Sequence, residues 1–146
     1  DAGCGPSSLA MVISYFQNKE ISVDTIGEKI VEKGLRNCDS GSSPLIMTVI
    51  PSAYGLSSAE IEPLAFENWK KEVKKCFDEG GLIIARIAGP SKFTAGSRHF
   101  ITLTGITDDY AYVTVNDSSK RICPRQEPLK DVYDFKKQPG TWCLKK

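Results

Sequence analysis

Apolar residues follow helical spacing in the first part of the chain. Over residues 7–18 they lie on most sides of a helix, which is typical of a helix buried under other layers. A second helix is predicted from Asp24 onward, because apolar residues recur at helical spacing and Gly34 is placed to end it. A turn-rich loop over 36–44 then leads to a third helix over 45–54.

The spacing changes in the second half of the chain. Residues 66–79 have one apolar and one lysine-rich side and predict an amphipathic helix. Apolar runs then predict buried strands over 82–87 and 99–106. A tight turn at 108–109 leads into a strand over 110–116, so the last two strands are expected to form an antiparallel hairpin.

A short helix over 128–135 and a terminal strand over 141–144 complete the predicted elements. Because helices come first and an antiparallel sheet follows, the order indicates an α+β fold with a helical layer packed on one sheet. The length suits one domain over residues 1–146, with no repeat or internal linker. Since the chain begins at Asp1 without methionine, we interpret it as a domain excised or processed from a longer protein.

Composition narrows the possible functions. Apolar residues make up 40% of the chain and charged residues 25%, as in ordinary globular domains. The net charge of +1 gives no electrostatic reason to expect nucleic acid or a membrane surface as a partner. No apolar run is long enough to insert into a membrane, and the lone histidine and scattered cysteines predict no metal or cofactor site. We expect a monomer.

Cys4 stands in a segment suited to a nucleophile. Gly3 and Gly5 allow close approach of backbone and substrate, and Pro6 favours the first turn of a helix. At a helix N-terminus the unsatisfied N–H groups and the helix dipole favour thiolate over thiol. A buried structural thiol, the common role of a free cysteine, needs neither the glycines nor the helix start. The sequence therefore predicts that Cys4 is reactive.

His99 is the only histidine and opens a predicted strand after a small polar loop. We expect its imidazole at the edge of the sheet near solvent, where it can serve as a general base. Asp117 follows one strand, a turn and the returning strand, which brings it back beside His99 to fix the imidazole tautomer. Asn116 is the alternative partner, and because side chains alternate along a strand only one of the two can point at His99.

Three segments together resemble the bacteriocin-processing (double-glycine) peptidase-like branch of the papain-like cysteine peptidases: residues 3–12, 98–106 and 115–117. The resemblance implies a papain-like fold with Cys4 as nucleophile, His99 as base and Asp117 as the group that orients it. Residues 53–56 look more like the extracellular, cell-wall-associated members than like peptidase domains fused to transporters.

The resemblance also implies an upstream glutamine that completes the oxyanion hole. Only residues 1–3 precede Cys4, and Gln17 lies on the far part of the same helix. The backbone N–H of Cys4 remains as one oxyanion donor.

The leading hypothesis is a cysteine peptidase that hydrolyses amide bonds through a thioester on Cys4. Peptidoglycan peptides are favoured as substrate over a small secreted peptide, because the chain shows no transporter and is nearly neutral. This predicts an extracellular or cell-wall-associated domain of a secreted bacterial protein. Two alternatives stay open: an acyltransferase or transpeptidase with the same triad, and a catalytically inactive papain-like binding domain.

The remaining cysteines and the tryptophans have structural interpretations. Two disulfides in an oxidising compartment, with Cys123–Cys143 as the favoured pair, are one possibility, and unpaired core thiols are the other. Four cysteines are involved: Cys38, Cys76, Cys123 and Cys143. Trp69 and Trp142 are expected in the core, not as platforms for substrate.

Overall fold

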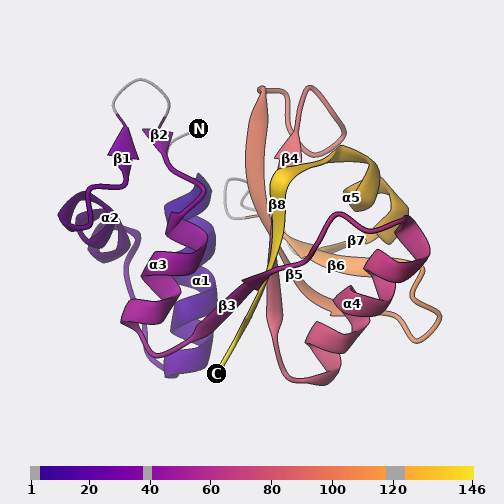
Figure 1. Cartoon of the computed structure of the whole chain (residues 1–146), viewed down its shortest axis with the longest axis horizontal. Coiled ribbons are helices and arrows are strands. Elements are labelled where there is room, and N and C mark those ends of the chain that lie inside the picture. Colours follow the sequence, from indigo (N-terminus) through magenta and orange to yellow (C-terminus); the bar gives the residue numbers. More distant parts are fainter. Residues whose placement is uncertain (1–3, 38–40, 118–123) are drawn as a thin grey trace.

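The structure, a computed structural model, describes residues 4–37, 41–117 and 124–146, which form two packed halves (Figure 1). The first half is helical and includes a short hairpin: α1 (Cys4–Gln17), α2 (Val23–Glu32), β1 (Arg36–Asn37), β2 (Gly41–Ser42) and α3 (Ile46–Ala53). The second half is a six-stranded sheet with two further helices, α4 (Phe66–Asp78) and α5 (Leu129–Phe135).

The six-stranded sheet is antiparallel throughout, and its strand order differs from the chain order. From one edge to the other the strands are β3 (Ser57–Glu60), β8 (Lys136–Lys145), β4 (Leu82–Ala88), β5 (Arg98–Ile106), β6 (Tyr112–Asn116) and β7 (Arg125–Pro128). Helices α1 to α3 lie beside one face, and α4 and α5 lie beside the other (Figure 1). The predicted α+β class, with N-terminal helices packed on an antiparallel sheet, is confirmed.

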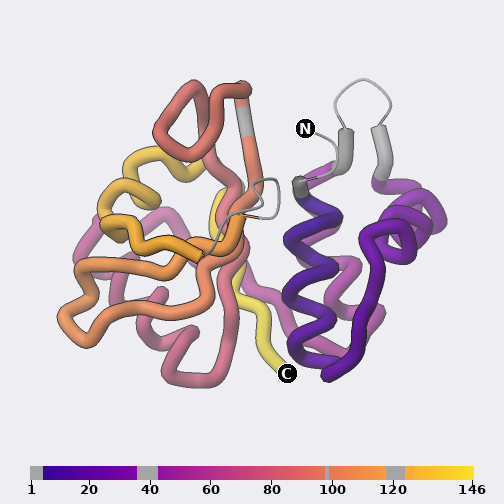
Figure 2. Tube along the Cα trace, turned by 180° about the vertical axis from the view of Figure 1, so that it is seen from behind, coloured from indigo at the N-terminus to yellow at the C-terminus, as the bar shows by residue number. Residues whose placement is uncertain are grey.

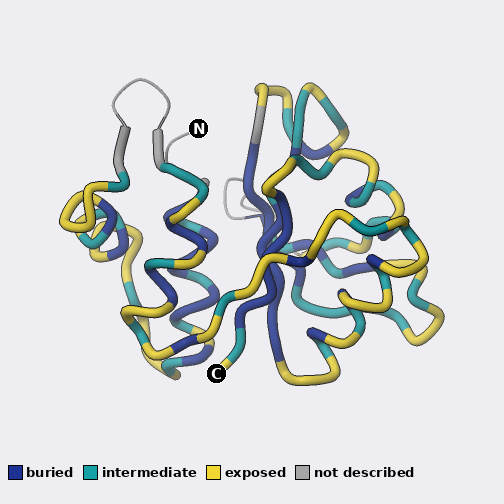
Figure 3. Tube along the Cα trace, in the orientation of Figure 1, coloured by how far each residue is buried: buried dark blue, intermediate teal, exposed yellow. Residues whose placement is uncertain are grey.

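Each face of the sheet has its own apolar cluster. Along β4, Leu82 and Ile84 pack toward the first three helices, whereas the intervening Ile83 packs toward α4 and α5. A strand covered on both faces has no polar side, which explains its continuous apolar run. In Figure 3 the residues of this central region are coloured as buried. Trp69 and Trp142 are both buried, in opposite clusters, so their predicted place in the core is confirmed.

Local signals in the sequence set the helix ends. Ser22 caps α2, because its hydroxyl accepts a hydrogen bond of 3.1 Å from the backbone N–H of Thr25. Gly34 and Gly55 follow α2 and α3 with φ angles of 71° and 76°, which glycine adopts without strain. All five predicted helices are present as α1 to α5, and their observed bounds differ from the predicted ones by a few residues. The predicted helices were 7–18, the helix from Asp24, 45–54, 66–79 and 128–135.

The predicted strands 82–87, 99–106 and 110–116 correspond to β4, β5 and β6, and the predicted hairpin of the last two is present. Strands β1 and β2 lie inside the predicted loop over 36–44 and were not predicted. Nor were β3 and β7. Both are four-residue edge strands, and they lack an apolar alternation because only one side is paired and most of their side chains stay partly or fully exposed. Strand β8 begins at Lys136 instead of 141, because Lys136 pairs with Ile87 near the end of β4, beyond a shift in the register.

The favoured disulfide is wrong. Cys143 is bonded to Cys76, which joins the last turn of α4 to β8. Cys123 and Cys38 lie outside the described residues. The pairing could not be read from the sequence, because it arises where α4 packs on the central strands. Gly81 makes the close approach possible, since a Cβ there would lie 2.7 Å from the Cys76 sulfur.

Opening this disulfide is expected to destabilise the fold. The bond spans 67 residues, and constraint of a loop of that length in the unfolded chain contributes about 4 kcal/mol. We expect the double variant Cys76→Ser/Cys143→Ser to melt roughly 10–15 °C below the oxidised protein. Reductant should lower the melting temperature of the parent protein and leave that of the variant unchanged. Peptide mapping that links Cys143 to Cys123 would contradict the assignment.

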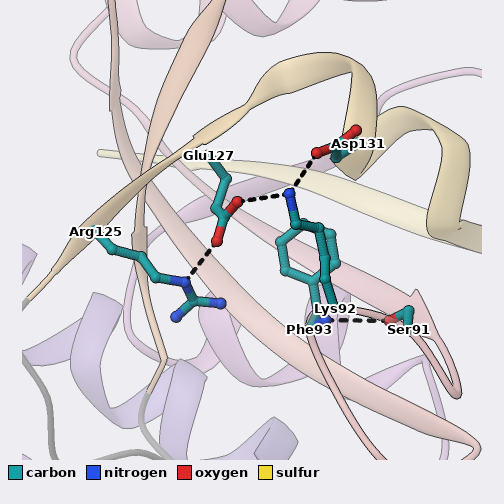
Figure 4. Close-up of polar contacts among 6 residues, drawn as sticks. All are labelled: Ser91, Lys92, Phe93, Arg125, Glu127 and Asp131. Carbon is teal, nitrogen blue, oxygen red and sulfur yellow. Dashed lines mark hydrogen bonds and ion pairs between the residues drawn. The ribbon is translucent and has the colours of Figure 1, made fainter.

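The loop between β4 and β5, which leads into His99, is anchored by a charged network (Figure 4). Lys92 lies 3.0 Å from a carboxylate oxygen of Glu127 on β7 and 2.6 Å from one of Asp131 on α5. Arg125 holds the other oxygen of Glu127 at 2.7 Å. The neighbouring Phe93 is fully buried. The start of β5 is therefore tied to elements at the far edge of the sheet.

The network shifts the ionisation of its members. Burial alone would raise the pKa of Glu127, but hydrogen bonds from Arg125 and Lys92 and their charges outweigh burial and hold it below its ordinary value of 4.5. Hydrogen bonds to Asp131 and Glu127 raise the pKa of Lys92. Both shifts favour the charged pairing at neutral pH.

A pH series on Lys92→Gln tests this network. Because the pKa of Glu127 is lowered on folding, its contribution is present above the unfolded pKa and is lost as the pH falls through the folded pKa. We expect the variant to be less stable than the parent at pH 7, and the difference to shrink below roughly pH 4. Urea denaturation at pH 7 and pH 3 measures both differences. An equal difference at the two pH values would contradict the network.

Candidate active site

His99 and Asp117 form a buried pair. The Nε2 atom of His99 lies 2.8 Å from an Oδ1 oxygen of Asp117. Only 5% of the histidine side chain and none of the aspartate side chain are exposed. A hydrogen bond between such groups is stronger in a buried setting than in water, and it fixes the ring orientation.

The strand register explains why His99 meets Asp117 and not Asn116. Asn116 stands opposite Thr102 in the β5–β6 pairing, so both project to the same face. Its amide donates to the hydroxyl of Thr104 at 2.8 Å. Residue 117 therefore projects to the opposite face, which it shares with His99, and the two lie diagonally across adjacent strands. The structure thus brings together two of the three predicted site residues.

The expectation that His99 lies near solvent at the edge of the sheet is wrong. Strand β5 is internal, with β4 on one side and β6 on the other, and His99 is 4% exposed. It pairs with Ile87 at the start of the strand. The polar loop before it suggested exposure, but exposure of the loop does not extend to the first residues of a strand that is paired on both sides.

Cys4 is the first residue of α1, as predicted, and is described by its backbone. Its neighbour Gly5 places it relative to the sheet. A Cβ on Gly5 would lie 3.0 Å from the Cδ1 of Ile46 and 3.4 Å from the ring of Phe100, which directly follows His99. The start of α1 and the start of β5 are therefore in contact, at the same end of the molecule (Figure 2).

Sequence reasoning did not identify Ile46 and Phe100 as the residues that pack against the start of α1. The only signal for them was Gly5 itself, since a glycine at a helix start indicates close packing without naming the partner. Gln17 is not near this end. Its side chain donates to the carbonyl oxygen of Tyr54 at 2.7 Å, which occupies it at the other end of α1.

Within residues 4–37, 41–117 and 124–146, no three His, Cys, Asp or Glu side chains gather into a group that could hold a metal ion. Over the same part of the chain, every helix is too short or too polar to cross a membrane.

Solved structures share this fold along nearly the whole chain. A C39-like peptidase of Bacillus anthracis has a TM-score of 0.67 at 14% identity, over 100% of this chain and 90% of that one. The peptidase domain of Streptococcus ComA, a bifunctional ABC transporter, also has a TM-score of 0.67. Its sequence identity is 12%, and the match covers 99% of this chain and 91% of that one. The third structure is the N-terminal peptidase C39-like domain of a toxin secretion ATP-binding protein from Vibrio parahaemolyticus. Its TM-score is 0.53 at 17% sequence identity, and the match covers 97% of this chain and 94% of that one.

A search of curated proteins found no significant match. The model of the Peptidase_C39 like family, in contrast, matches residues 1–142, nearly the whole length. The resemblance noted in the sequence is thereby confirmed. The chain belongs to the Peptidase_C39 like family and is by that membership a cysteine peptidase, a hydrolase.

Proposed function

We propose that the chain hydrolyses peptide amide bonds with Cys4, His99 and Asp117 as its catalytic triad. The observation that carries this proposal is the buried 2.8 Å contact between His99 and Asp117. It lies at the end of β5 that packs against Gly5, the neighbour of Cys4. An imidazole held by a carboxylate, at the end of the sheet that meets the helix start bearing a cysteine, supplies a base, an orienting group and a nucleophile.

In the proposed mechanism Asp117 accepts a hydrogen bond from Nε2–H of His99, which makes Nδ1 the basic nitrogen. Nδ1 takes the proton of the Cys4 thiol, and the thiolate attacks the carbonyl carbon of the substrate. The backbone N–H of Cys4 stabilises the oxyanion. The imidazolium then protonates the leaving amine as the C–N bond breaks. Water, deprotonated by His99, hydrolyses the thioester and releases the acid.

As substrates we propose peptidoglycan stem or cross-bridge peptides, with the domain acting outside the cell or at the wall. The likeness of residues 53–56 to extracellular members and the net charge of +1 support this choice. Maturation of a small secreted peptide is the alternative. It is supported by the ComA and Vibrio domains, which are parts of transport proteins. Purified wall material and a leader peptide ending in two glycines should therefore be tested in parallel.

Replacement of the nucleophile is the first test. Cys4→Ser is expected to lower kcat/KM by at least about a thousandfold on whichever substrate is cleaved, since a serine hydroxyl is far less acidic and less nucleophilic than a thiol. Circular dichroism and the melting temperature should match those of the parent, because the exchange replaces one sulfur by oxygen and keeps the size of the side chain. A variant that retains a tenth of the activity would contradict the assignment. Product analysis with an added amine distinguishes hydrolysis from acyl transfer.

Removal of the orienting carboxylate is a separate test. Asp117→Ala is expected to lower kcat by about a hundredfold or more, because His99 then loses the partner that fixes its tautomer. Asn116→Ala is the matched control, since Asn116 contacts Thr104 and not the imidazole. It should keep kcat within about twofold. Equal losses in the two variants, at similar melting temperatures, would show that Asp117 has no special role.

A further inference from the structure

A pocket of about 340 Å³ is lined by residues of α3 and the segment before it, of β3 and of β8, and it includes no residue of the proposed triad. Its walls are mainly apolar: Pro44 and Leu45 come from the helical half, and Pro139 and Trp142 come from β8. Leu45 is 60% exposed at its edge. The volume is at the lower end of the range for small-ligand sites, roughly 300–1,000 Å³, and suits one long side chain.

Glu60 is the one charged residue among the described residues that line this pocket. It stands opposite Trp142 in the β3–β8 register, so its carboxylate and the indole project to the same face. One carboxylate oxygen accepts a hydrogen bond of 3.2 Å from the backbone N–H of Gly140, which orients the group. Arg86 donates to the carbonyl oxygen of Pro139 at 3.4 Å but does not line the pocket.

On both sides of the pocket, the lining residues are next to residues that pack against the start of α1. On one side the ring of Trp142 lies 6.4 Å from that of Phe100, which would contact a Cβ on Gly5. On the other side Leu45 precedes Ile46, which would contact the same Cβ. A substrate side chain in the pocket would therefore belong to a residue close to the bond presented to Cys4.

We propose that this pocket is a specificity subsite for a substrate side chain with an aliphatic stem and a terminal cation, such as lysine or a related diamino acid. The apolar walls take the methylene groups, and Glu60 takes the ammonium group. The inference rests on the proposed function, since the side chain belongs to the peptide that Cys4 cleaves.

Binding to the Cys4→Ser variant tests the subsite without catalysis. The probes are blocked glycine pentapeptides that carry lysine or norleucine at one position, because norleucine keeps the stem and lacks the ammonium group. We expect the best lysine peptide to bind about tenfold more tightly than its norleucine counterpart in calorimetry. Adding Glu60→Gln should abolish that difference by weakening the lysine peptide alone.

Glu62→Gln is the matched control, because it removes the same charge from a residue that does not line the pocket. It should keep the lysine preference. Equal binding of both peptides at every position, no binding of either, or a preference that survives Glu60→Gln would overturn the subsite.

Hydrolysis by the parent protein separates this proposal from the proposed function. A Glu60-dependent lysine preference in binding, with no cleavage of peptides, leader or wall material, would support the subsite and reject the catalytic proposal. Cleavage with equal kcat/KM for lysine and norleucine peptides would support catalysis and reject the subsite.

Discussion

The buried hydrogen bond between His99 and Asp117 is the interaction on which the proposed site depends. It exists because the antiparallel register of β5 and β6 places the two residues diagonally on one face. A shift of one residue would move one partner to the other face and leave a carboxylate or an imidazole buried without its partner. The sheet that surrounds the pair therefore determines the chemistry available at its end.

The two halves of the molecule contribute different parts to this arrangement. The helical half carries Cys4 at the start of α1, where backbone N–H groups favour a thiolate. The sheet half carries the imidazole and fixes it, with Lys92 and its carboxylate partners anchoring the preceding loop. Gly5 lets the halves meet closely, since a side chain there would press on Ile46 and Phe100. Catalysis by a triad requires both halves to be held in this contact.

Most of the fold could be predicted because helical spacing and apolar runs reflect burial directly. What could not be predicted depends on tertiary packing. Strands β3 and β7 carry no apolar pattern. The disulfide partner of Cys143 depends on which part of the sheet α4 packs against. The burial of His99 follows from its internal strand, which a local polar loop cannot reveal. Glu60 lacked any signal, because its neighbours in the pocket come from distant segments.

The most direct test of the central claim uses the fact that His99 is the only histidine in the chain. Nitrogen NMR of protein labelled in histidine gives the signals of this one imidazole without assignment. The account predicts a proton on Nε2 that exchanges slowly with water and disappears from the slow-exchange spectrum in Asp117→Ala. A neutral ring protonated on Nδ1, or one whose protons exchange as in free histidine, would contradict it.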